Sequence, residues 1–100
     1  MTSSEEKILL EQVAKGNEFA FRRLYDERHQ RVYAFAFFLT RSGVLAEEVT
    51  QEIFIKIWIH RAELSEILNF DAWFMTLVRN QSYRFLNRLA RERLYLQEMA

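Results

Sequence analysis

The sequence predicts an all-α fold, a compact bundle of about four helices in a single domain. The 100 residues include no proline and only two glycines, so helices meet few interruptions and sheet turns have little material. Half of the residues are hydrophobic and 15% are aromatic, which is enough to build one core. Apolar residues also recur at helical spacing along most of the chain.

The first expected helix begins near residue 4 and ends at Gly16. Ser3 and Glu6 have the spacing of a capping box, in which two side chains satisfy backbone N–H groups of the first turn. Gly16 suits the left-handed conformation that terminates many helices. Asn17 is a favourable N-cap for the helix that follows.

The second expected helix covers residues 18–40. Its inner stripe recurs at helical spacing and would face the core. That stripe consists of Phe21, Leu24, Tyr25, Val32, Phe35, Ala36 and Leu39. The high density of phenylalanine predicts burial on more than one side of the helix, which would include Phe19, Phe37 and Phe38.

The third expected helix covers residues 45–61, after a break at Arg41-Ser42-Gly43. Its apolar side predicts a core stripe of Val49, Ile53, Phe54, Ile57 and Trp58. Its other side is acidic and amide-bearing, with an isoleucine at its end: Glu48, Gln51, Glu52 and Ile55 fall at i, i+3, i+4 and i+7. On spacing alone, this second side fits a solvated helix face and a protein-docking face equally well.

Residues 62–69 have no helical stripe and predict a connecting loop with a short turn. Asn69 would cap a fourth helix, expected from Phe70 to at least Arg91. The buried side of this helix would consist of Phe74, Leu77, Val78, Phe85 and Leu89.

The outer side of the fourth helix has features of a nucleic-acid interface. An aromatic ring, amides and a guanidinium approximate one face: Trp73, Thr76, Asn80, Tyr83, Arg84 and Asn87. Arg84, Arg88 and Arg91 form a basic ridge that suits a run of phosphates. Aromatic rings stack on unpaired bases, and Asn can read base edges. Spacing alone supports this interpretation and a plain solvated face equally.

Charge is segregated although the net charge is zero. Residues 41–70 contain three basic and five acidic residues, whereas residues 79–93 contain five basic residues and one acidic residue. The two segments therefore suggest two surfaces with different partners. The absence of an overall basic excess favours single strands over duplex as a nucleic-acid partner.

Catalytic and metal-binding patterns find no support in the sequence. His29 and His60 stand alone, the chain has no cysteine, and no Gly-rich phosphate loop is present. The sequence therefore predicts that the protein is not an enzyme and uses no cofactor or metal. The longest apolar run, residues 32–39, is too short to cross a bilayer, and the first residues do not resemble a signal peptide. We expect a cytoplasmic protein without membrane insertion.

Two long segments in this order resemble region 2 of bacterial sigma factors. They are Ala-Glu-Glu-Val-Thr-Gln-Glu-Ile-Phe-Ile-Lys-Ile-Trp at residues 46–58 and Asn-Phe-Asp-Ala-Trp-Phe-Met-Thr-Leu-Val-Arg-Asn-Gln-Ser-Tyr-Arg-Phe-Leu-Asn-Arg at residues 69–88. The chain is most similar to the extracytoplasmic-function (ECF) group of the sigma-70 family, of the kind common in Bacteroidetes. The resemblance covers residues 5–95.

The resemblance implies two binding surfaces on a compact helical module. One docks on the clamp helices of the largest subunit of core RNA polymerase, and the matching residues are Glu48, Gln51, Glu52 and Ile55. The other captures the unpaired non-template strand of the minus-ten promoter element. It corresponds to residues 61–69 and the start of the last helix, with Asn69, Phe70, Trp73, Arg79, Asn80, Arg84 and Arg88 at the matching positions.

The resemblance also implies an anti-sigma factor as a partner, and a second helix-turn-helix domain in a complete factor. That second domain is absent from residues 1–100, so we expect the chain to be an isolated or truncated region 2 domain. The rival interpretation is a helical protein-interaction module, an adaptor or an anti-sigma-bound domain, that makes no direct contact with DNA.

Overall fold

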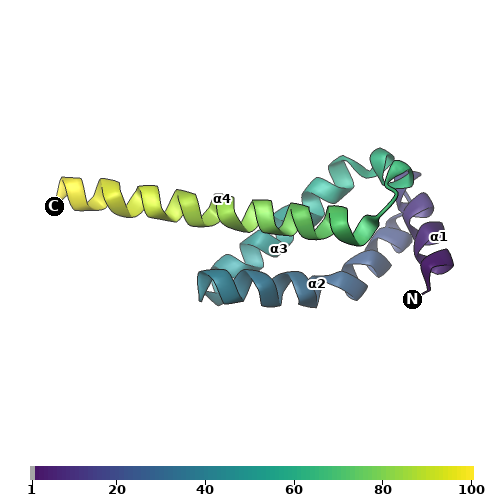
Figure 1. Cartoon of the computed structure of the whole chain (residues 1–100), viewed down its shortest axis with the longest axis horizontal. Coiled ribbons are helices and arrows are strands. Elements are labelled where there is room, and N and C mark those ends of the chain that lie inside the picture. The colour runs from purple at the N-terminus through teal and green to yellow at the C-terminus, as the bar shows by residue number, and fades with distance from the viewer. Residues whose placement is uncertain (1) are drawn as a thin grey trace.

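A computed structural model describes residues 2–100, and these residues form helices without any strand, as predicted. The helices are α1 (Ser3–Ala14), α2 (Glu18–Thr40), α3 (Gly43–Ile59), the short 3₁₀ helix η1 (Arg61–Glu66) and α4 (Phe70–Met99). In Figure 1, α2 leads away from α1 and α3 returns in the opposite direction. Helix α4 then runs alongside them and projects beyond the bundle, which gives the molecule extents of 55 × 22 × 21 Å.

The ends of α1 are set by local hydrogen bonds. Thr2 caps the helix by accepting a hydrogen bond from the backbone N–H of Glu5 at 3.2 Å. The prediction of Ser3 as the cap was therefore wrong by one residue, because the neighbouring Thr2 supplies an equivalent hydroxyl. At the other end Gly16 has a φ of 87°, as predicted for a terminating glycine. Its N–H donates to Val13 and that of Asn17 to Gln12, the two bonds of a Schellman motif.

Helix α3 begins at Gly43, two residues earlier than predicted. Arg41 ends α2 with a φ of 55°, in the left-handed region. Ser42 then caps α3, and its hydroxyl oxygen accepts a hydrogen bond from the N–H of Leu45 at 3.2 Å. The helix ends at Ile59 rather than at residue 61, because the chain tightens there into η1.

The core forms where all four α-helices and η1 meet. Its fully buried side chains come from every element and include Val13, Leu24, Val32, Ile53, Ile57, Leu64, Phe74 and Val78. The predicted inner stripe of α3 lies in this core, apart from the half-buried Trp58. None of the helices within residues 2–100 is long and apolar enough to cross a membrane.

One expectation about burial was wrong. Phe19, Phe37 and Phe38 are 88%, 40% and 64% exposed, because α2 packs against its neighbours along one side only. The Phe38 ring is instead covered in part by the Arg41 guanidinium, 5.4 Å from its centroid. The segment predicted as a loop with a short turn contains η1, which packs against α1 and buries Leu64.

Candidate docking face and nucleic-acid interface

The four predicted docking residues lie together on the outer side of α3. Glu48 and Gln51 are exposed, Glu52 is half-buried, and the Ile55 side chain is 57% exposed. An isoleucine this exposed within an acidic and amide-bearing face gains from being covered by a partner. The arrangement therefore combines an exposed apolar side chain with acidic and amide groups, a composition found at protein-docking surfaces.

An open groove between α2 and α3 borders this docking face. Aromatic rings form its floor, with the Phe21 and Trp58 centroids 5.0 Å apart and those of Tyr25 and Phe54 4.8 Å apart. Ile55 and Gln51 also line the groove. A helix that contacts Ile55 can therefore place an apolar side chain in the groove as well.

Two further exposed apolar residues lie on the same side of α3 as the predicted docking residues and were not among them. Val44 and Ile59 are 73% and 64% exposed on the same helix. At about 100° per residue, both fall on the stripe of Glu48, Gln51 and Ile55. Their helical spacing was the available signal, but it could not be separated from core spacing without knowing which side of α3 is buried.

Glu52 belongs to the docking face but is also bound to α4. Its carboxylate accepts a hydrogen bond from Nε2 of Gln81 at 2.6 Å. The Lys56 ammonium in turn donates to Oε1 of Gln81 at 2.6 Å. Since Gln81 is only 5% exposed, this buried amide fastens α3 to α4 directly behind the docking face.

The outer side of α4 displays most of the predicted nucleic-acid residues. Asn80, Arg84 and Arg91 are exposed, and the half-buried Trp73 lies on the same line along the helix. Arg84, Arg88 and Arg91 also line a shallow groove toward α3. The structure does not place Arg79 on this line. Arg79 precedes Arg84 by five positions, which corresponds to a rotation of about 140° around the helix.

Two predicted nucleic-acid residues have structural roles at the start of α4. The side-chain oxygen of Asn69 caps the helix by accepting a hydrogen bond from the N–H of Ala72 at 3.1 Å. Phe70 is 4% exposed and packs against Phe74, with the ring centroids 5.5 Å apart. Phe70 therefore offers no open face for a base, although it supports Trp73, whose ring lies 5.8 Å away.

The docking face and the nucleic-acid face meet along one edge of the molecule. Arg88 of α4 lies 3.9 Å from Glu48 of α3 and 3.9 Å from Glu92. Its guanidinium also lies over the Phe85 ring, 4.4 Å from the centroid. Arg88 is thus partly neutralised, whereas Arg84 and Arg91 form no ion pair among the described residues.

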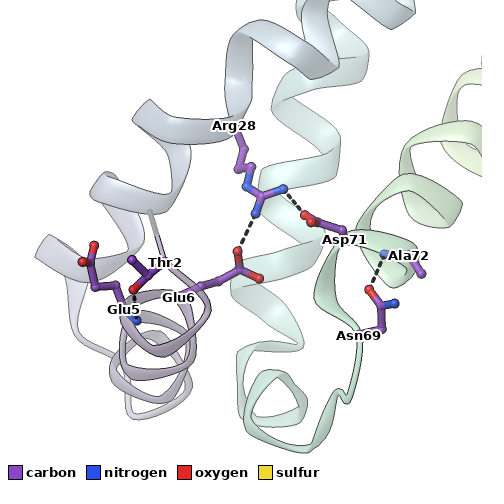
Figure 2. Close-up of polar contacts among 7 residues, drawn as sticks. All are labelled: Thr2, Glu5, Glu6, Arg28, Asn69, Asp71 and Ala72. Carbon is purple, nitrogen blue, oxygen red and sulfur yellow. Dashed lines mark hydrogen bonds and ion pairs between the residues drawn. The ribbon is translucent and has the colours of Figure 1, made fainter.

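A cleft separates α1 from the segment that leads into α4. Residues from both walls line it, including Leu10 and Glu6 of α1 and Ile67, Asn69 and Phe70 of the opposite wall. Figure 2 shows Arg28 of α2 reaching into the same junction, between Glu6 and Asp71. Within residues 2–100, no group of His, Cys, Asp or Glu side chains is arranged to hold a metal ion.

Comparison with known proteins identifies a matching family and several relatives. Residues 24–92 match the family model for Sigma-70 region 2. The ECF RNA polymerase sigma factor SigK of Mycobacterium tuberculosis (strain ATCC 25618 / H37Rv) is 31% identical over 81 residues, which is 80% of this chain and 43% of the relative. SigK of Mycobacterium ulcerans (strain Agy99) is 30% identical over 81 residues, with the same coverage of both chains. The chain thus spans less than half the length of these relatives. No solved structure matches it significantly.

Proposed function

The chain belongs to the sigma-70 region 2 family, and we propose that it docks on core RNA polymerase and captures the unpaired strand of the minus-ten promoter element. It performs no covalent chemistry and contributes binding energy to strand opening. The cytoplasm, where bacterial polymerase works, is its place of action.

The exposed Ile55 is the observation on which polymerase docking chiefly rests. It lies at the end of the acidic and amide-bearing stripe of α3 and on the rim of the aromatic groove. A partner with basic and apolar side chains would complement this stripe, and the clamp helices of the largest polymerase subunit are the partner that the family resemblance implies. Val44 and Ile59 would widen the contact at its two ends.

Strand capture rests on the outer side of α4. Trp73 offers an aromatic ring for an unpaired base, Asn80 offers an amide for a base edge, and Arg84 and Arg88 approach the phosphates. Asn69 and Arg79 would add contacts at the start of α4 and on its flank. The cleft between α1 and residues 64–71 lies beside this surface and is open to a flexible single strand.

Ile55→Ala tests docking, and the chain provides a matched control in Ile8→Ala. Both isoleucines are 57% exposed, but Ile8 lies on α1, away from the proposed docking face. We expect Ile55→Ala to weaken binding to core polymerase about five- to tenfold, because an exposed apolar side chain of the contact is lost. Ile8→Ala should bind core polymerase with an affinity within about twofold of the wild-type value. Equal affinities of the two variants for core polymerase would contradict the proposed docking face.

A module without DNA contact is the second candidate, and the zero net charge is the observation in its favour. A protein partner such as an anti-sigma factor would then use the exposed apolar side chains, and α4 would only supply solubility. Binding of single-stranded DNA by the purified domain, measured at several salt concentrations, separates the two candidates. A domain that binds polymerase but no single strand at any salt concentration would be such a module.

A further inference from the structure

We propose that Arg28 is a positioning residue for strand capture, which holds the start of α4 and the segment before it in place. The inference rests on the proposed function, since it concerns the same surface. Arg28 lies on α2, behind that surface, and would touch neither bases nor phosphates. It would act through Phe70 and Asp71, which lie between Asn69 and Trp73 in the first turn of α4.

Arg28 joins three helices at one point (Figure 2). Its guanidinium donates to Oε2 of Glu6 on α1 at 2.8 Å and to Oδ1 of Asp71 in the first turn of α4. The Arg28 side chain is only 13% exposed, and that of Glu6 is 22% exposed. The guanidinium also lies 5.2 Å and 5.8 Å from the ring centroids of Phe70 and Phe74.

This combination of partners requires an arginine. The planar guanidinium can bond two carboxylates with different nitrogens while one of its faces lies over aromatic rings. Lysine has a single ammonium and no planar face, so it cannot hold all of these partners in one geometry. The direction of the guanidinium thus fixes where the first turn of α4 lies relative to α1 and α2.

The first turn of α4 determines how the proposed strand-binding residues are presented. Asp71 lies between the cap residue Asn69 and Trp73, and the Trp73 ring packs on Phe70. The preceding segment is fixed at Leu64, which is buried against the bundle. Beyond Leu64, Ile67 packs against the core, Phe70 is buried, and the Arg28–Asp71 bond supplies the polar contact at the entry into α4.

We expect the Arg28 network to fix the position of the start of α4 rather than to add net stability to the fold. Removing charges from water costs about as much as an ion pair returns, so partly buried networks are weak sources of stability. They do specify geometry, because an alternative arrangement leaves a charge without its partner. Glu6 lies outside residues 24–92, so its link to Arg28 is not part of the family match.

The experiment compares Arg28→Met with Arg31→Met in the full 100-residue chain. Arg31 is an exposed arginine three residues further along α2, so both variants lose the same charge in the same region. The probe is a labelled single strand of about ten nucleotides, selected from a random pool by the wild-type protein. We expect Arg28→Met to weaken its binding about fivefold or more and Arg31→Met by less than about twofold. Both variants should bind core polymerase as the wild type does.

Two further readouts separate positioning from folding. The chain has two tryptophans, so the indole N–H signal of Trp73 can be followed by NMR, and it should move in Arg28→Met but not in Arg31→Met. The double variant Arg28→Met/Glu6→Gln also removes the charge of Glu6, the less exposed of the two carboxylates that Arg28 pairs, at 22% against 61% for Asp71. It should recover part of the lost thermal stability without recovering strand affinity.

Three outcomes would count against the inference. If Arg28→Met binds the strand with wild-type affinity, the positioning role of Arg28 is overturned and the proposed function stays intact. Recovery of both stability and strand affinity in the double variant would overturn it in favour of a purely structural role. A wild-type protein that selects no strand from the pool would overturn the proposed function, and this inference with it.

Discussion

Trp73 is the residue on which the proposed strand capture most depends. Its indole is half-buried against Phe70, so the ring is held in one orientation before a base arrives. A ring that is already ordered loses little further entropy on binding. Base–aromatic stacking contributes about 1–3 kcal/mol for each base, which is large for a domain that offers few aromatic contacts to a strand.

Trp73→Ala should therefore weaken single-strand binding about fivefold to a hundredfold. Trp73→Phe should retain part of the affinity, because phenylalanine keeps an aromatic face of smaller area. Phe19→Ala is the control, since Phe19 is an exposed aromatic residue on α2 rather than on α4. Fluorescence anisotropy of a labelled strand measures the affinities, and circular dichroism verifies that each variant is folded. Trp73→Ala binding as tightly as Phe19→Ala would refute the stacking role.

At the scale of whole elements, the contact between α3 and α4 decides how the two faces lie relative to each other. Gln81 is buried between these helices and bonds Glu52 and Lys56 at 2.6 Å each. Both partners are charged, and hydrogen bonds to charged groups are stronger than neutral ones. A residue of the docking face is thus held by the helix that carries the nucleic-acid face.

Gln81→Met should lower the free energy of unfolding by about 1–2 kcal/mol. Methionine matches the length of glutamine but leaves two half-buried charges without the amide between them. The loss stays moderate because Glu52 and Lys56 are four residues apart on α3 and can pair directly. Gln97→Met is the matched control, the same change at an exposed site on the same helix, and should change stability by less than about 0.5 kcal/mol. Urea unfolding of both variants tests this, and equal midpoints would contradict it.

The elements also show what sequence reasoning could and could not reach. Helix α3 was predicted with both of its sides correctly divided, because a strict 3.6-residue period separates Val49 and Ile53 from Glu48 and Ile55. The phenylalanines of α2 were misjudged, because composition does not reveal how many sides of a helix have neighbours. Arg28 could not be recognised at all, since its partners lie 22 and 43 residues away in the sequence and no local pattern marks such a junction.

At the scale of the whole molecule, a neutral chain can bind nucleic acid because its charges are separated in space. The acidic stripe lies on α3 and the basic ridge of Arg84, Arg88 and Arg91 lies on α4, and the two surfaces meet along the edge where Arg88 approaches Glu48. Figure 1 shows α4 continuing past the other helices, and its last turns are exposed and add nothing to the core. One partner can therefore contact α3 while a strand lies along α4.

This arrangement predicts a particular salt dependence. For single strands, the logarithm of the binding constant falls with the logarithm of salt concentration by about 0.7 for each phosphate neutralised. Arg84→Ala and Arg91→Ala should each reduce the slope by about that amount. Arg88→Ala should reduce it less, because Glu48 and Glu92 already offset part of its charge. The exposed Arg23 on α2 serves as the control, and Arg23→Ala should leave the slope unchanged. Binding is titrated at four or more salt concentrations, and equal slope changes for Arg23 and Arg84 would mean that the overall charge, rather than the α4 face, attracts the strand.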